Sequence, residues 1–123
     1  MRRAGRKDEH HVATVDYLRR HGFDVVDFGS VGTVPDLLVT KAGIVSFIEL
    51  KVPGSGAKWY ARQLRWIADT KFNVAVAKSP EDALAAVRDR RFLSQRTKDG
   101  IAALLAVQYR ESYTPKQIEV LMR

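Results

Sequence analysis

The feature that most constrains the fold of this chain is a pair of short apolar runs within residues 35–51, separated by a turn-forming segment at 41–43. The glycine in that segment favours a tight hairpin between two antiparallel strands. Side chains alternate between the two faces of a strand, and both faces of residues 44–51 begin apolar, which is typical of a strand covered on both sides. Glu49 and Lys51 share one of these faces and are therefore predicted to point together into a largely covered region.

Two carboxylates are predicted to meet at the end of this hairpin. Asp36 begins the first strand, and antiparallel pairing brings it beside Glu49. An ionised carboxylate in a covered region is costly unless a metal ion or a partner charge compensates it. With the Leu50 carbonyl and the Lys51 ammonium nearby, the group suits a hard divalent cation with an activated water. The alternative is a structural ion pair between Glu49 and Lys51 in an unrelated α/β protein.

The order and spacing of these residues resemble a known signature. Pro-Asp at 35–36, followed by Glu-Leu-Lys at 49–51, is similar to the motif of the PD-(D/E)XK nuclease superfamily. The surrounding pattern, Gly-x-x-Pro-Asp-Leu-Leu-Val and then a helix carrying Gln63, most resembles the virus-type replication-repair nuclease (VRR-NUC) domains. The archaeal Holliday-junction resolvases are similar relatives. The likeness covers about residues 7–90, and its specificity comes from the order and strand context of the motif rather than from either half alone.

The resemblance implies a metal-dependent endonuclease that hydrolyses DNA phosphodiesters. It implies Mg²⁺, with Mn²⁺ as a substitute, held by Asp36, Glu49 and the Leu50 carbonyl. It gives Lys51 the role of positioning the attacking water or stabilising the oxyanion. Gln63 matches a glutamine that steadies the catalytic residues in the family. The alternative for Gln63 is an ordinary residue at the edge of the core.

The resemblance also implies a branched DNA substrate, such as a Holliday junction or a flap, in replication, recombination or repair. A two-fold symmetric junction needs two sites related by a two-fold axis, and a single small domain supplies one, so we expect a homodimer. The rival function is a non-catalytic nucleic-acid-binding module with a nuclease-like fold.

Composition favours a nucleic-acid partner and excludes several chemistries. Lysine and arginine number 21 against 14 acidic residues, a net charge of +7, which favours a polyanion, although a charge spread over the surface for solubility is the alternative. The absence of cysteine excludes disulfides, thiolate-zinc sites and cysteine nucleophiles. No apolar run approaches the roughly 20 residues needed to span a bilayer, and the basic N-terminus lacks a secretory signal. We therefore expect no membrane partner and a cytoplasmic or nucleoid-associated protein of a bacterial cell or phage-infected host.

The predicted fold class is α/β, with a restriction-endonuclease-like core in which helices flank a mixed sheet of about four strands in the order αβββαβ. The chain, residues 1–123, is predicted to be one domain with a core at about 7–90 and a C-terminal helical extension at about 91–123. The segments that carry this pattern are helices at 7–21, 58–70 and 79–90, strands at 23–28, 36–40, 44–51 and 72–77, and helices in the extension at 101–107 and 115–122.

The first predicted helix offers a further acid for the metal site. Many relatives carry an acidic residue on this helix, and Glu9 is the matching position, with Asp16 as the second choice. Alternatively, Glu9 only complements the helix dipole. An apolar stripe is predicted at Val12, Val15 and Leu18.

The three histidines do not predict a metal site. His10 and His11 diverge by about 100° around a helix. His21 lies about 16 Å further along the axis. We expect these histidines to be solvated or to contact a partner.

Nucleic-acid contacts are predicted on both sides of the hairpin. The glycine-rich loop at 29–35 offers Ser30 and Thr33 as donors to phosphate. On the helix at 58–70, the basic residues of the more exposed side are Lys58, Arg62 and Arg65. A second basic run at 88–98 could also contact nucleic acid, and in both places a solvated basic face is the alternative.

Overall fold

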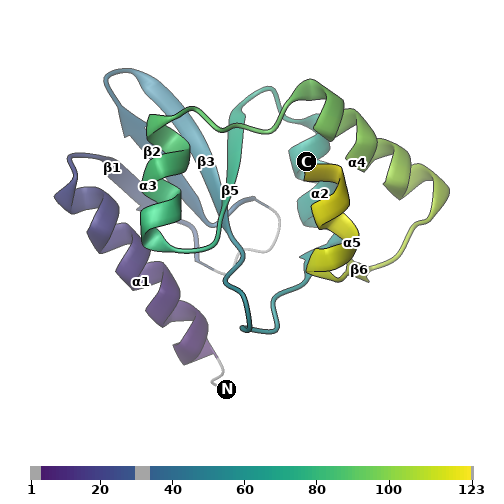
Figure 1. The fold of residues 1–123 in the computed structure, drawn as a ribbon, viewed down its shortest axis with the longest axis horizontal. Coiled ribbons are helices and arrows are strands. Elements are labelled where there is room, and N and C mark those ends of the chain that lie inside the picture. Colours follow the sequence, from purple (N-terminus) through teal and green to yellow (C-terminus); the bar gives the residue numbers. More distant parts are fainter. Residues whose placement is uncertain (1–3, 30–33, 123) are drawn as a thin grey trace.

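The computed structural model describes residues 4–29 and 34–122, with the side chains of the first helix described from Glu9 onward. The chain has an α/β fold in which a mixed four-stranded sheet carries helices on both faces (Figure 1). The strands are β1 (Asp24–Asp27), β2 (Leu37–Lys41), β3 (Ile44–Leu50), β4 (Trp59–Tyr60), β5 (Asn73–Ala77) and β6 (Ser112–Tyr113). The helices are α1 (Ala4–Arg20), α2 (Ala61–Asp69), α3 (Pro80–Arg88), α4 (Gln95–Val107), α5 (Pro115–Glu119) and the 3₁₀ turn η1 (Val120–Met122).

The main sheet has the strand order β1-β2-β3-β5. The first three strands form an antiparallel meander, and β5 joins β3 in parallel after the helical crossover through α2, as predicted. The β2–β3 hairpin turns at Ala42 and Gly43, whose φ angles of 54° and 81° are both positive. Positive φ at both central residues is the requirement of a type I′ hairpin, so the glycine has the role that the sequence indicates.

Each face of the sheet is covered by its own hydrophobic cluster. Helices α1 and α3 lie on one side of the sheet, and α2, α4 and α5 lie on the other (Figure 1). Along β3, Ile48 and Leu50 belong to the cluster under α1 and α3, whereas Phe47 belongs to the cluster with α2, α4 and α5. This alternation confirms that the strand is covered on both sides, and the C-terminal extension supplies Ile101, Leu105 and Ile118 to the second cluster.

Two local predictions were wrong. Val12 is 54% exposed and does not belong to the buried stripe of α1, which instead contains His11, Thr14, Val15 and Leu18. These positions follow a spacing of three to four residues from His11, and Val12 lies about 100° away from His11 around the helix. Residues 59 and 60, predicted to be helical, form β4, which pairs with β6 in a separate two-stranded sheet that no prediction anticipated.

Three helix starts depend on capping residues. Ser79 and Thr114 accept hydrogen bonds from Asp82 N and Gln117 N. The third cap, Ser94, accepts from Thr97 N, and α4 therefore begins six residues before the predicted start of that helix at 101.

Arg88, Arg90, Arg91 and Arg96 of the basic run at 88–98 are exposed, but Lys98 is not part of a solvated or DNA-contacting face. It is 6% exposed, and its ammonium donates to the carbonyls of Thr70 and Phe72 at 2.8 and 3.1 Å. Desolvation by this burial, with a smaller contribution from the charge of Lys71, lowers the pKa of Lys98 from its usual value. Lys98 therefore links α4 by hydrogen bonds to the residues that follow α2.

Candidate functional site

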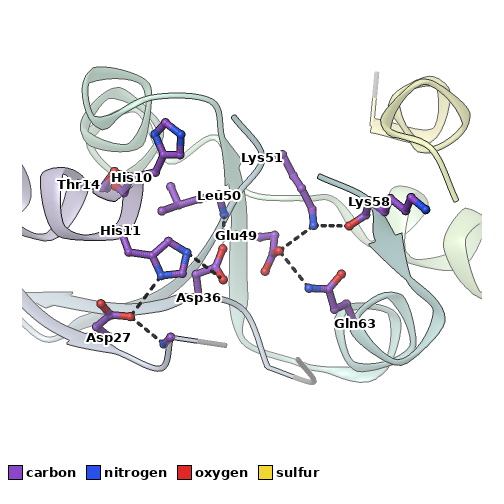
Figure 2. Close-up of polar contacts among 11 residues, drawn as sticks. His10, His11, Thr14, Asp27, Asp36, Glu49, Leu50, Lys51, Lys58 and Gln63 are labelled. Carbon is purple, nitrogen blue, oxygen red and sulfur yellow. Dashed lines mark hydrogen bonds and ion pairs between the residues drawn. The ribbon is translucent and has the colours of Figure 1, made fainter. Parts of the chain in front are cut away.

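Asp36 and Glu49 lie side by side at one end of the β2–β3 hairpin (Figure 2). The register pairs Leu37 with Ile48, so the residue before β2 comes beside the next residue of β3. Asp36 is 5% exposed and Glu49 is 1% exposed. Leu50 N donates to Asp36 Oδ2 at 2.8 Å, which ties the Asp36 carboxylate to the backbone of the neighbouring strand. The hairpin thus places two buried carboxylates at the position that its sequence predicts.

Lys51 completes a charge pair with Glu49. Its Nζ atom lies 3.0 Å from Glu49 Oε2 and donates to the carbonyl oxygen of Lys58 at 2.7 Å. The same ammonium lies 4.5 Å from the centroid of the Trp59 ring, within the range of a cation–π contact. A carboxylate, a carbonyl and an aromatic ring therefore hold Lys51 in one orientation. Its side chain is 10% exposed, so some of it reaches solvent.

Gln63 links α2 to the same carboxylate. Its Nε2 atom donates to Glu49 Oε2 at 3.2 Å, and its Oε1 atom accepts from Tyr60 N at 3.0 Å. The second bond belongs to a capping box at the start of α2, so the residue that caps the helix also contacts the site. The predicted role of Gln63 in steadying the site has this contact as its physical basis.

His11 was missed by sequence reasoning, which predicted a solvated or partner-contacting histidine. It is 4% exposed and lies between two carboxylates, with Nε2 3.4 Å from Asp36 Oδ1 and Nδ1 3.6 Å from Asp27 Oδ1 (Figure 2). Asp27 Oδ1 also accepts from Gly29 N at 2.7 Å. His11 thus connects α1 to the end of β1 and to Asp36. The available signal was its spacing of four and seven residues from Val15 and Leu18, which places it on the buried face.

The acids proposed on the first helix are not brought to the carboxylate pair. Glu9 and Asp16 are both exposed. Within residues 4–29 and 34–122, no three or more histidine or acidic side chains lie close enough together to form a metal cluster. Glu9 therefore does not join Asp36 and Glu49 in this arrangement.

The predicted nucleic-acid residues have mixed outcomes. Ser30 and Thr33 lie outside the described residues. Lys58, Arg62 and Arg65 are exposed, as predicted for the solvent side of α2 and the segment before it. Lys58 is joined to the site through its carbonyl oxygen, which accepts from Lys51. Of these three residues, only Lys58 contacts the site, and it does so through its backbone.

The donor set fits Mg²⁺. This ion retains several waters and is usually held by one or two carboxylates rather than by a full protein cage. Asp36 and Glu49, on neighbouring strands and both buried, supply such a pair. Oxygen donors without cysteine favour Mg²⁺ or Mn²⁺ over softer metals.

Comparison of the chain with protein-family models, with curated proteins and with solved structures finds no match. Of the helices in the described part of the chain, none has the length and apolar character to cross a membrane.

Proposed function

We propose that this protein is a metal-dependent DNA endonuclease of the VRR-NUC type within the PD-(D/E)XK superfamily, with a restriction-endonuclease-like core. The observation that carries the proposal is the convergence of Asp36, Glu49 and Lys51 at one end of the β2–β3 hairpin, with Gln63 reaching Glu49 from α2. The motif supplies the residue types, and the burial of two carboxylates beside the Lys51 ammonium supports a site for a phosphate bound with a cation.

Asp36, Glu49 and the Leu50 carbonyl would hold Mg²⁺. When bound, the ion supplies Lewis-acid neutralisation of the phosphate and acidifies a coordinated water. Lys51 would position the attacking water or stabilise the negative charge that develops on the phosphate oxygens, for which its fixed ammonium is suited. Gln63 would keep the Glu49 carboxylate oriented. We leave Glu9 out of the ligand set because it is exposed and belongs to no cluster with the two carboxylates.

The proposed substrate is branched DNA, and the proposed active form is a homodimer. The net charge of +7 and the exposed Lys58, Arg62 and Arg65 support a polyanionic partner. The need for two symmetric incisions in a four-way junction supports the dimer. Sedimentation of the protein with a four-way junction checks this, and a monomer bound to the junction at cleavage-competent concentrations contradicts the dimer.

The test is a cleavage panel on linear, splayed, flap and four-way DNA with Mg²⁺, Mn²⁺ or EDTA. The wild type is expected to cleave only with metal, and Asp36→Asn, Glu49→Gln and Lys51→Met are each expected to lower the rate about a hundredfold or more. Glu81→Gln, which changes an exposed carboxylate in the first turn of α3, is the matched control and should cleave at the wild-type rate.

The rivals predict different outcomes of the same panel. A non-catalytic nucleic-acid-binding module binds DNA with strong salt dependence but does not cleave it with any metal. A protein in which Glu49 and Lys51 are only a structural ion pair neither cleaves nor shows salt-sensitive binding. Wild-type cleavage by a folded Lys51→Met protein contradicts the proposed role of Lys51.

A further inference from the structure

Lys51, but neither Asp36 nor Glu49, lines a pocket of about 990 Å³. Its size is at the upper end of the range for small-molecule sites, which is roughly 300–1,000 Å³. The lining is mainly apolar and includes Val52, Pro53, Phe92, Leu93, Pro115 and Met122.

Two parts of the chain supply most of the lining of this pocket, and β5 with the residue after it adds Val76 and Lys78. One is the segment from Lys51 to Trp59, which follows β3 and leads into α2. The other is the C-terminal extension, through residues 91–94 before α4 and through α5 and η1. In Figure 1, α5 lies on the same side of the sheet as α2 and α4. The extension lies outside the nuclease resemblance, so the pocket is a feature of this chain's own C-terminal segment.

The charged residues of the pocket are mostly cationic. Lys51, Lys58, Lys78 and Arg91 line it with the single acid Glu119. Two of these cations also bind carboxylates outside the lining, because Arg91 lies 2.7 Å from Asp82 Oδ1 and Lys51 lies 3.0 Å from Glu49 Oε2. Lys78 and Glu119 are 4.0 Å apart with side chains 64% and 56% exposed, so solvent weakens their attraction. An apolar pocket with a cationic margin is complementary to a nucleotide, whose base is flat and apolar on its faces and whose phosphate is anionic.

We infer that this pocket binds an unstacked nucleoside of a single-stranded DNA segment, adjacent to the phosphate that meets Lys51. The inference rests on the proposed nuclease function for the position of the phosphate, and it names the substrate class as DNA with a single-stranded portion at the cleavage point. Lys51 belongs to both places, because its ammonium contacts Glu49 and its side chain lines the pocket. A base inside a duplex is stacked and paired and cannot enter, so the pocket selects flaps, splayed ends and open junctions over continuous duplex.

Phe92 is the residue on which the base would stack. It lines the pocket and is partly exposed, whereas Trp59 is 3% exposed and has the Lys51 ammonium over its ring. Removing an aromatic platform weakens single-strand binding by about tenfold or more. The Phe92→Ala variant therefore tests the inference directly.

The experiment measures fluorescence anisotropy of a labelled thymidine oligonucleotide and of a blunt duplex of equal length, in EDTA, so that binding is separated from cleavage. The wild type is expected to prefer the single strand, and Phe92→Ala is expected to weaken single-strand binding about tenfold while duplex binding stays within about twofold. Val52→Trp, which fills the pocket from its loop, should have the same selective effect and provides a second test if Phe92→Ala unfolds. Tyr109→Ala removes a 65% exposed aromatic of the same extension that does not line the pocket, and it should change neither affinity.

The outcomes separate the inference from the proposed function. Selective loss in the pocket variants without any metal-dependent cleavage by the wild type supports the pocket and contradicts the nuclease. Metal-dependent cleavage by a wild type that binds both DNAs equally, or unchanged single-strand affinity in a folded Val52→Trp protein, overturns the inference. Binding of a free nucleotide or of a second protein copy at the pocket, with no effect of these variants on DNA, overturns it as well.

Discussion

Asp36 and Glu49 are neighbours in the site but are held by different parts of the molecule. Asp36 is tied to α1 through His11 and to β3 through Leu50 N. Glu49 is tied to α2 through Gln63 and carries the Lys51 ammonium on the same oxygen. The first carboxylate is therefore oriented from the α1 side of the sheet, and the second is oriented from the α2 side.

The difference follows from the sheet. Helices α1 and α2 lie on opposite faces, each with its own hydrophobic cluster (Figure 1), and each helix sends one side chain, His11 or Gln63, to one of the two carboxylates. Positioning one carboxylate does not require the contacts that position the other. Substitutions on the two sides should therefore affect stability and activity independently, and each prediction below tests that separation.

The largest effect on stability is expected on the Glu49 side. Glu49→Gln removes the ion partner of Lys51, whose side chain is only 10% exposed, and leaves an ammonium in a largely covered position. We expect a loss of about 3 kcal/mol in the free energy of unfolding, measured by urea denaturation. Asp36→Asn keeps an oxygen that can accept from Leu50 N and should cost less.

A double-mutant cycle sharpens this comparison. If the cost of Glu49→Gln comes from the ammonium left behind, adding Lys51→Met should recover about 1 kcal/mol or more. The cycle of Asp36→Asn with Lys51→Met should give a smaller coupling. Equal couplings in the two cycles would mean that Lys51 senses both carboxylates alike, and the separation of the two sides would fail.

On the Asp36 side, the expected effect is intermediate. His11→Ala removes a 4% exposed side chain and leaves the Asp27 and Asp36 carboxylates without the imidazole between them. We expect about 2 kcal/mol of destabilisation by urea denaturation, together with a lower cleavage rate at saturating DNA. Asp27→Asn is the matched control, because it changes the outer contact of His11 and leaves the inner contact to Asp36. It should lower stability but leave the cleavage rate near wild type.

What could be predicted from the sequence is local. Alternation along residues 44–51 and the glycine at 43 fix the hairpin and its register, and the register alone brings Asp36 beside Glu49. The helical pattern placed Gln63 only at the edge of the packed face, and its role at the site came from the resemblance; the assignment of that helix to residues 58–70 was three residues too long at its start.

What could not be predicted depends on contacts between distant segments. The pairing of Trp59 with Tyr113 joins two-residue strands that have no periodicity to read. The spacing of His11 indicates that it lies on a buried face, but its carboxylate partners come from other elements, as do the carbonyls that allow Lys98, an ordinarily exposed residue type, to be buried. Sequence periodicity does not reveal the distant partners that allow a polar side chain to be buried. One of these two residues, His11, contacts Asp36 of the candidate site.

The smallest effect on stability is expected for two glutamines, Gln63 and Gln117, that have the same local role. Comparing them is also the most specific test of how Glu49 is oriented. Gln63 and Gln117 each close a capping box, with Oε1 accepting from Tyr60 N at 3.0 Å and from Thr114 N at 2.9 Å. Replacing either by alanine should lower the free energy of unfolding by about 1 kcal/mol, because each variant loses the hydrogen bond between this side chain and the backbone N–H of the N-cap residue. Only Gln63 also donates to Glu49, at 3.2 Å.

Cleavage kinetics therefore separate the two variants where denaturation does not. We expect Gln63→Ala to lower kcat about tenfold with little change in KM, because a carboxylate that is no longer oriented affects the chemical step more than DNA binding. We expect Gln117→Ala to cleave at the wild-type rate. Gln63→Glu retains an oxygen for Tyr60 N but places a second carboxylate against Glu49, so it should keep the cap and still lose activity. If Gln63→Ala and Gln117→Ala lose activity equally, the contribution of Gln63 is only that of a helix cap, and Glu49 is oriented by Lys51 without help from α2.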